Sequence, residues 1–249
     1  MTEPTDLFAW CMERAAMPPP PDAVPLDRLT DAATLDAMLA PVAGKYPGGD
    51  SRATASLWVK LQCRAVLAPM TAILLRATRD GGPAPRPVGL VLQGGQPAGL
   101  ALSPDGLADA DAFAAAVLRD HLAPVFDAIR LRTRLSARVS WSNAGNLLEW
   151  ALARFASDPR FGPAASHWLD VLVAPRRNRL FPVRNPLYAP VRAVAVQVDG
   201  TSIPHRQRVV CCLRDRLPGL PLCTTCPRLS PEALANLARQ HGRARPSRQ

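Results

Sequence analysis

Four cysteines near the carboxyl end constrain this chain more than any other feature of its sequence. Cys211, Cys212, Cys223 and Cys226 follow the spacing C-C-x10-C-x2-C within residues 208–227. Four thiolates at short range satisfy either a tetrahedral zinc ion or the four terminal positions of a [2Fe–2S] cluster. Two prolines and a glycine lie between the second and third cysteine and allow the segment to fold back. We therefore expect a metal centre here.

The adjacent pair Cys211 and Cys212 helps to distinguish these two kinds of site. Zinc sites usually take paired ligands from a C-x2–4-C turn, whereas the side chains of neighbouring residues diverge. A flat cluster with two iron atoms relaxes that requirement. The spacing favours an iron–sulfur cluster and leaves zinc and unligated thiols as alternatives. Cys11 and Cys63 have no cysteine neighbours and are expected to be buried apolar thiols.

Composition and segment lengths indicate a cytoplasmic protein. The chain has 249 residues, of which 48% are hydrophobic, and is long enough to bury a core. Met1–Trp10 contains acidic residues where a secretory signal would have a basic start and an apolar run. Ala55–Leu75 is interrupted by charged residues and a proline, so we expect a buried helix and no transmembrane segment. In a reducing compartment, cysteines are metal ligands or thiols more often than disulfides.

The apolar pattern predicts an α+β fold that is mostly helical, with a small antiparallel sheet and a C-terminal cysteine-rich segment docked on it. Glycines between two short apolar runs predict a hairpin, and a later strand ends at the turn signal Asp199-Gly200. Ser230 and Pro231 are suited to begin the last helix. The helices are expected over 4–17, 26–42, 51–76, 108–130, 142–157, 161–173 and 230–241, and the strands over 87–92, 98–102 and 191–198.

The same pattern divides the chain into three parts. Residues 1–200 are expected to form the α+β body, and residues 201–241 the segment that binds the [2Fe–2S] cluster. Residues 242–249 contain almost no apolar side chain, so we predict a disordered tail.

The positive charge is concentrated at the carboxyl end. The net charge is +10, yet residues 1–50 contain eight acidic residues and only three basic ones. Residues 203–249 contain nine arginines and two acidic residues. Nucleic-acid binders often interleave aromatic residues with such charge, and this basic segment has none. A nucleic-acid partner is therefore disfavoured.

The cysteine segment resembles the carboxyl-terminal signature of the FhuF-type ferric siderophore reductases. The shared pattern is Arg-x-x-Cys-Cys-Leu-x-x-Arg-Leu-Pro-Gly followed by Leu-Cys-x-x-Cys-Pro, which includes the flanks of the cysteines. Ser142 stands where the family often has glycine. Residues 1–50 and 80–110 carry no match. Three upstream segments extend the resemblance over most of the chain from about residue 50: Ser56-Leu57-Trp58, Trp141-Ser142-Asn143-Ala144 and Asn185-Pro186-Leu187.

The resemblance implies that Cys211, Cys212, Cys223 and Cys226 hold a [2Fe–2S] cluster, with no catalytic residue beyond it. It also implies a cytoplasmic reductase that converts Fe(III) to Fe(II) in a siderophore, often of the hydroxamate type. Hard oxygen chelators hold Fe(II) more weakly than Fe(III), so one electron loosens the chelate. Two alternatives stay open: a Zn-stabilised module that binds nucleic acid or protein, and an electron-transfer protein with a different acceptor.

Several arginines and polar residues are candidates for the surroundings of the cluster and for the substrate. Arg208, Arg214 and Arg216 flank the first cysteine pair and are expected to favour the more negative reduced cluster, or else to be a solvated surface. Arg and Asn donate to chelator oxygens. Core packing and a turn are the alternatives for the matching segments. The candidate siderophore contacts are Trp141, Asn143, Arg184 and Asn185.

The source of the electron is expected to be another protein. Neither G-x-G-x-x-G nor G-x-x-x-x-G-K-[ST] occurs, so the sequence has no dinucleotide or phosphate loop. We expect an external donor such as a ferredoxin or a flavoprotein reductase.

Overall fold

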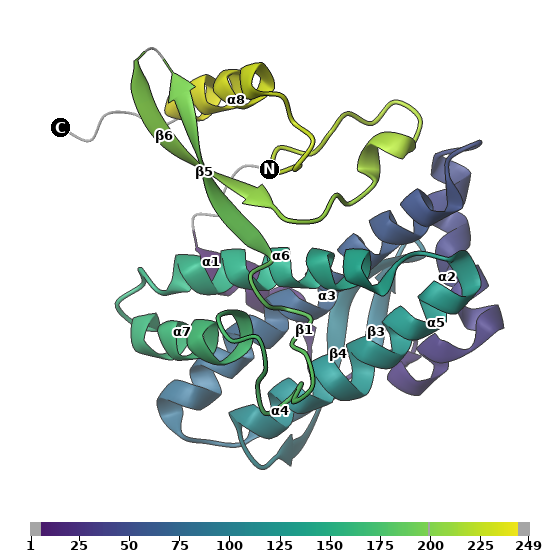
Figure 1. Cartoon of the computed structure of the whole chain (residues 1–249). Helices are drawn as coiled ribbons and strands as arrows, with labels where there is room; N and C mark the ends of the chain where they lie inside the picture. The colour runs from purple at the N-terminus through teal and green to yellow at the C-terminus, as the bar shows by residue number, and fades with distance from the viewer. Residues whose placement is uncertain (1–5, 199, 244–249) are drawn as a thin grey trace.

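A long central helix organises the larger part of the molecule. In the computed structural model, which describes residues 6–198 and 200–243, α3 (Ser51–Asp80) crosses the body and packs against α6 and the sheet (Figure 1). It begins where the Asp50 side chain accepts a hydrogen bond from the backbone N–H of Arg52. It ends at Gly81, whose φ of 68° is the left-handed conformation that glycine adopts without strain. The prediction of a buried helix in this segment is confirmed, because most side chains of α3 lie in the core.

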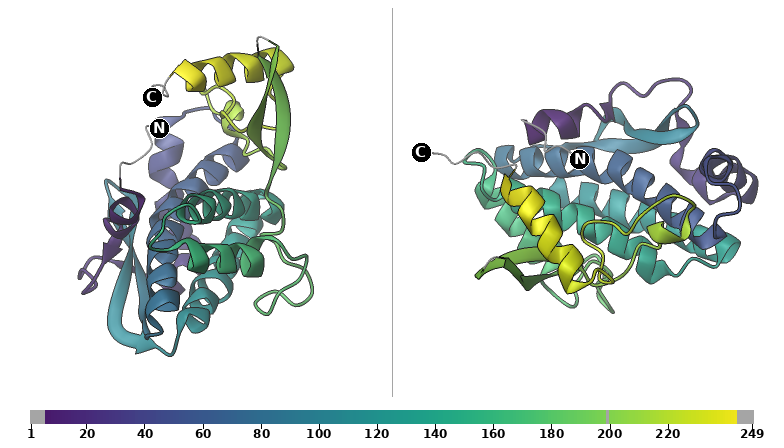
Figure 2. Two further views of the ribbon diagram at one scale, coloured as in Figure 1. Left: turned by 90° about the vertical axis from the view of Figure 1, so that its left-hand side faces the viewer. Right: turned by 90° about the horizontal axis from the view of Figure 1, so that it is seen from above.

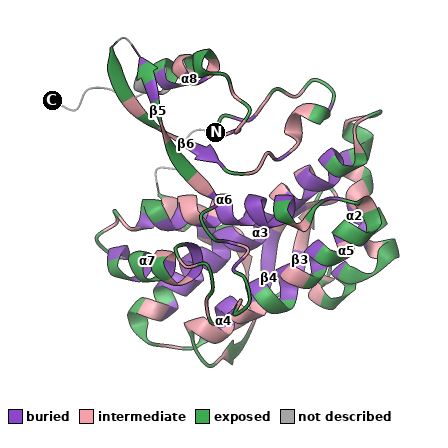
Figure 3. Cartoon of the chain, viewed as in Figure 1, coloured by how far each residue is buried: buried purple, intermediate pink, exposed green. Residues whose placement is uncertain are grey.

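The length and composition of α3 would also allow it to cross a membrane. Its most apolar 18-residue window, however, is 78% buried inside the protein. Figure 3 shows the buried residues gathered along α3 and on the sheet behind it. The apolar composition of α3 is therefore explained by its packing against the other helices and the sheet.

A four-stranded sheet packs against α3. The hairpin of β3 (Ala84–Gln93) and β4 (Gln96–Leu107) turns at Gly94 and Gly95, both at positive φ, and confirms the predicted hairpin. Short β2 (Val24–Pro25) pairs antiparallel with β3. β1 (Ala15–Ala16) pairs parallel with β4, so the sheet is mixed rather than purely antiparallel.

The other helices surround α3, and several predicted helices differ from the observed ones. The predicted helix over 142–157 begins earlier, at Ala137, and the one over 108–130 is interrupted by a π-helical turn and ends at Thr133. The predicted helix over 4–17 is wrong beyond Met12, because the chain turns there into β1. The predicted helix over 26–42 begins as a 3-10 turn and becomes α-helical only from Ala32. The remaining segments are α1 (Leu7–Met12), the 3-10 turn Leu26–Thr30, α2 (Ala32–Lys45), α4 (Ala110–Val117), α5 (Ala123–Thr133), α6 (Ala137–Phe155), α7 (Gly162–Trp168), and π-helical turns at Leu118–Leu122 and Leu169–Val173.

The carboxyl-terminal part forms a smaller unit above the body (Figures 1 and 2). Strand β5 (Val191–Val198) has the predicted bounds and pairs antiparallel with β6 (Thr201–Arg208), which the sequence analysis missed. Helix α8 (Pro231–Arg243) packs on β5 and buries four apolar side chains with it. This small core contains Val196, Val198, Leu234 and Ala238.

Two predictions concern the boundaries of this unit. Ser230 caps α8 by accepting a hydrogen bond from the N–H of Ala233 at 3.1 Å, as predicted. The helix extends to Arg243, beyond the predicted end at residue 241 and into the tail predicted over 242–249, of which residues 244–249 lie outside the described residues. The division of the chain at residue 200 stays a prediction, and one hairpin spans that position.

Candidate metal centre

The four candidate cysteines come together in the loop between β6 and α8. Figure 1 shows the course of this loop. The sulfur of Cys211 lies 3.8 Å from that of Cys226, and the sulfur of Cys212 lies 3.7 Å from that of Cys223. Three of these side chains are buried and Cys211 is partly exposed. The loop thus brings the thiols together as two close pairs.

The paired arrangement fits a centre with two metal atoms. A tetrahedral metal with bonds of about 2.3 Å separates its sulfur ligands by about 3.8 Å, so each pair matches one metal atom. Among residues 6–198 and 200–243, no group of three or more metal-binding side chains is arranged to hold a single ion. Cys211 and Cys212 belong to different pairs, as the divergence of adjacent side chains requires. This geometry fits a diiron cluster better than zinc.

Hydrogen bonds, burial and charge act in different directions on the thiols of this loop. The backbone N–H of Leu213 donates to the sulfur of Cys211 at 3.4 Å. A hydrogen bond from Cys223 lowers the pKa of Cys212 to about 5, with the positive charges of Lys60 and Arg208 acting in the same direction. The same hydrogen bond, together with burial, raises the pKa of Cys223, and burial raises the pKa of Cys226. Metal ligation by cysteine requires the thiolate, so metal binding would release protons from these two residues.

The two other cysteines lie elsewhere. Cys11 and Cys63 are fully buried in the main core, and burial raises the pKa of each thiol to about 12. The expectation of buried apolar thiols is confirmed for both.

A buried chain of hydrogen bonds joins the cysteine loop to the body. Arg208, only 1% exposed, donates to Oγ of Ser142 at 3.2 Å and to Oδ1 of Asn143 at 2.7 Å. The Asn143 amide donates to the carbonyl and hydroxyl oxygens of Ser56 at 3.2 and 3.1 Å. The hydroxyl of Ser56 donates to the carbonyl oxygen of Cys212 at 2.7 Å. Residues from α3, α6 and β6 therefore position the backbone of a candidate ligand.

These hydrogen bonds hold the side chain of Asn143 inside the protein. Its side chain is 3% exposed and both of its polar atoms have protein partners, so its amide is not available at the surface. Ser56 was not predicted as a site residue. Its membership of the matching segment Ser56-Leu57-Trp58 was the signal that could have identified it.

The other flanking arginines have different environments. Arg216 is exposed and donates to Oδ2 of Asp50 at 3.1 Å, which ties the cysteine loop to the start of α3. Arg214 is partly exposed. Asp215 lies 3.9 Å from the sulfur of Cys211 and is paired with Arg228 at 2.5 Å. Among the three predicted arginines, only Arg208 is buried.

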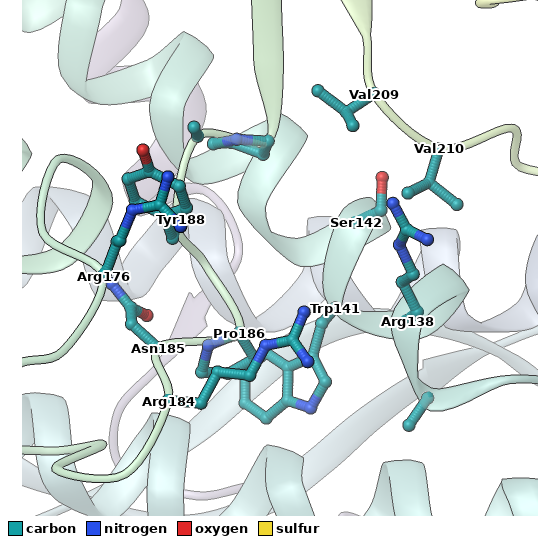
Figure 4. A pocket seen from close by; sticks show the side chains of 13 residues that line it. Arg138, Trp141, Ser142, Arg176, Arg184, Asn185, Pro186, Tyr188, Val209 and Val210 are labelled. Carbon is teal, nitrogen blue, oxygen red and sulfur yellow. The ribbon is translucent and has the colours of Figure 1, made fainter.

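A pocket of about 610 Å³ lies next to the cysteine loop (Figure 4). Val209 and Val210, which precede Cys211, form part of its wall. Three predicted contacts, Trp141, Arg184 and Asn185, also line it, whereas Asn143 does not. The other lining residues were not predicted as contacts: Ala137, Arg138, Ser142, Arg176, Pro186, Tyr188, Ala189 and Pro190.

Contacts with neighbouring residues hold two of the lining side chains, Asn185 and Trp141, in place. Asn185 is 3% exposed, and its amide donates to the carbonyls of Leu172 and Pro175 at 2.8 Å each. It therefore holds the loop before β5 in place. The ring of Trp141 contacts those of Phe126 and Phe181 edge-to-face, with centroids 5.0 and 5.4 Å away. These contacts fix the indole at the pocket wall.

The paired thiols fit the class of iron–sulfur proteins, with a pocket beside the metal centre. Two family models match the chain: the ferric iron reductase FhuF-like transporter model over residues 56–201, and the FhuF 2Fe-2S C-terminal domain model over residues 208–228. The chain belongs to the FhuF-like ferric iron reductase family and carries a [2Fe–2S] cluster. No curated protein matches it. The resemblance seen in the sequence is confirmed, and the zinc alternative loses its support.

Proposed function

We propose that this protein is a cytoplasmic ferric-siderophore reductase in which Cys211, Cys212, Cys223 and Cys226 are the cluster ligands. The observation that carries the proposal is the pairing of the four sulfurs in a loop that borders a pocket. We assign Cys211 and Cys226 to one iron atom and Cys212 and Cys223 to the other. When bound, a [2Fe–2S] cluster supplies one electron at a time, which matches the reduction of Fe(III) to Fe(II).

The pocket beside the loop is the proposed siderophore site. Its volume of about 610 Å³ is within the range of small-molecule sites. Trp141, Tyr188 and Pro186 offer apolar surface to the carbon framework of a chelator. Arg138, Arg176 and Arg184 can donate hydrogen bonds to its oxygens. A hydroxamate siderophore, which combines both kinds of surface, is the proposed substrate class.

Arg208 is the proposed tuning residue of the cluster. Among the residues that the structure describes, its guanidinium donates hydrogen bonds only to the neutral Ser142 and Asn143. No carboxylate of residues 6–198 and 200–243 lies within 4.0 Å of this guanidinium. A positive charge held in a buried site stabilises the more negative, reduced form of a nearby redox centre.

The electron is proposed to come from an external ferredoxin or flavoprotein reductase. The chain has no dinucleotide or phosphate loop in its sequence, and Gly94-Gly95 form the hairpin turn between β3 and β4. Oxidation of NADPH by the purified protein alone would contradict an external donor.

Elemental analysis after anaerobic purification tests the proposal. We expect two iron atoms and two inorganic sulfides per chain, with visible absorption that dithionite bleaches. Cys212→Ser is expected to lose the cluster and to keep the helical fold, while Cys63→Ala, outside the loop, keeps both iron and sulfide. A full complement of iron and sulfide in Cys212→Ser would remove this residue from the ligand set. Absence of sulfide from the wild-type protein would overturn the proposal.

A further inference from the structure

The pocket beside the cysteine loop has a positive rim and no acidic residue. Thirteen residues line it, and its charged side chains are Arg138, Arg176 and Arg184. Figure 4 shows Arg184 beside the indole of Trp141, with Arg176 and Arg138 to either side. All three arginines are exposed, so their guanidinium groups can move to meet a ligand. The lining thus combines a fixed aromatic wall with three mobile cations.

These three arginines form no ion pair with any carboxylate in the described part of the chain. Elsewhere arginines pair with carboxylates, such as Arg132 with Asp36 at 2.5 Å and Arg160 with Asp158 at 2.8 Å. Within residues 6–198 and 200–243, the rim arginines have no carboxylate within 4.0 Å. Of the three, Arg176 also lies over the ring of Tyr188, with its guanidinium carbon 5.0 Å from the ring centroid. Like charges gathered without counter-ions repel one another, and a negatively charged ligand relieves that repulsion.

We infer that this pocket prefers ferric chelates with net negative charge, which carry ionised carboxylates in addition to their iron-binding groups. The inference rests on the proposed function and specifies its substrate class. Three hydroxamates offset the charge of Fe(III), so a plain trihydroxamate complex is neutral. Each added carboxylate leaves one negative charge for a guanidinium to bind, in a planar two-bond geometry that suits arginine. Chelates with a free ammonium group are repelled by the same rim.

The positive rim also acts on the redox step. Reduction makes any bound chelate more negative by one charge. The arginines therefore bind the reduced complex more tightly than the oxidised one, which makes bound iron easier to reduce than free chelate. Selectivity for anionic chelates and ease of reduction follow from the same three side chains.

Binding of gallium(III) chelates to the cluster-loaded protein tests the inference without turnover. Gallium(III) has the charge of Fe(III) and is not reduced under these conditions. We compare three trihydroxamate complexes of similar size, with pendant carboxylates, amides or an ammonium group, by isothermal titration calorimetry. The carboxylate complex is expected to bind at least about tenfold more tightly than the amide complex, and the ammonium complex most weakly. The difference is expected to shrink at high ionic strength.

Variants that remove one positive charge test whether the rim arginines cause the preference for the carboxylate complex. Arg184→Gln and Arg138→Gln are each expected to weaken binding of the carboxylate complex by about three- to tenfold. Binding of the amide complex is expected to weaken less, by about twofold, because the Gln side chain still donates a hydrogen bond to a chelator oxygen. Arg177→Gln is the matched control, because Arg177 is exposed and adjacent to Arg176 but does not line the pocket. Equal loss of affinity in Arg177→Gln would show that overall charge, not the rim, is responsible.

The outcomes separate this inference from the function on which it rests. Equal affinity for the three gallium complexes overturns the inference. If the corresponding ferric complexes still reoxidise the reduced protein, the proposed function stands without it. If none of the ferric complexes reoxidises the reduced protein, the proposed function fails together with the inference.

Discussion

Arg208 is a buried cation whose hydrogen-bond partners are neutral, close to a loop of four thiols. Its side chain is 1% exposed and its Nε has no partner among the described residues. Burial of a charge without a counter-ion is costly, so such a residue requires compensation. The negative charge of the thiolate-ligated cluster would supply it. On this account Arg208 links the metal centre to the buried contact with α6.

Replacement of Arg208 by Gln is expected to lower the reduction potential of the cluster. The reduced form loses a nearby positive charge that stabilises it, and the potential moves to a more negative value. Arg214→Gln removes the same charge at a partly exposed position, where solvent screens it, and is expected to cause a smaller shift. An optical redox titration of both variants measures the shifts. Equal shifts would contradict a special role for Arg208.

His121 makes a separate contribution to stability at acidic pH. Burial lowers its pKa to about 4, and neither ring nitrogen has a hydrogen-bond partner among the described residues. The unfolded chain therefore binds more protons below pH 6.5. The free energy of unfolding should fall as the pH drops from about 6.5 to about 4, by an amount on the order of 3 kcal/mol.

The variant His121→Leu removes this titration without the loss of a hydrogen bond. Urea unfolding at several pH values is expected to show a shallower decline for the variant between pH 6.5 and 4. At pH 7.5, where the histidine is neutral in both states, stability should be similar or higher. An unchanged pH dependence would mean that other groups account for acid sensitivity.

At the scale of helices and strands, close backbone contacts determine which glycines can be replaced. An added Cβ at Gly145 of α6 would lie 2.8 Å from Cβ of Pro190, in the loop that lines the pocket. An added Cβ at Gly44 of α2 meets nothing within 4 Å. Gly145→Ala is expected to destabilise the protein by about 1–3 kcal/mol, and Gly44→Ala to stabilise it by about 0.5–1 kcal/mol.

Thermal unfolding of the two glycine variants checks this contrast. Both substitutions place alanine in a helix, so helix propensity acts in the same direction in each. A lower Tm for Gly145→Ala and a higher Tm for Gly44→Ala are expected. Similar shifts in both variants would contradict the close packing of Pro190 on α6.

The sequence predicted elements with strong local signals and missed those that depend on distant partners. Helix α3 was predicted from its dense apolar pattern, and β5 from alternation and a turn signal. Strand β6 was missed because Pro204, His205 and Arg206 give it no apolar alternation, and its pairing with β5 determines its structure. The strand at Ala15–Ala16 exists only because it pairs with β4.

At the scale of the whole molecule, residues far apart in sequence meet at one interface. Ser56, Asn143 and Arg208 come from three elements and form one hydrogen-bonded chain to the cysteine loop. The sequence identified the four cysteines by their spacing. It could not identify the pocket, because its walls come from α6, the loop before β5 and the end of β6. Tertiary contacts alone bring these segments together.

Asn143→Ala is expected to weaken the attachment of the cysteine loop to the body. The substitution removes a bond to the Arg208 guanidinium and two to Ser56, at a cost of about 2–4 kcal/mol in a buried site. Loss of cluster on dilution or exposure to a chelator should be faster than in the wild type. The rate of bleaching in the presence of EDTA measures this effect. A wild-type rate would show that the interface does not support the metal centre.

The central claim is that the cluster held by the four cysteines reduces chelated Fe(III). The most direct measurement mixes the dithionite-reduced, desalted protein anaerobically with one equivalent of a ferric trihydroxamate and follows both the cluster absorption and a colorimetric Fe(II) trap. We expect the oxidised spectrum to return with one Fe(II) trapped per cluster. A reduced spectrum that persists, with no trapped Fe(II), would contradict the account.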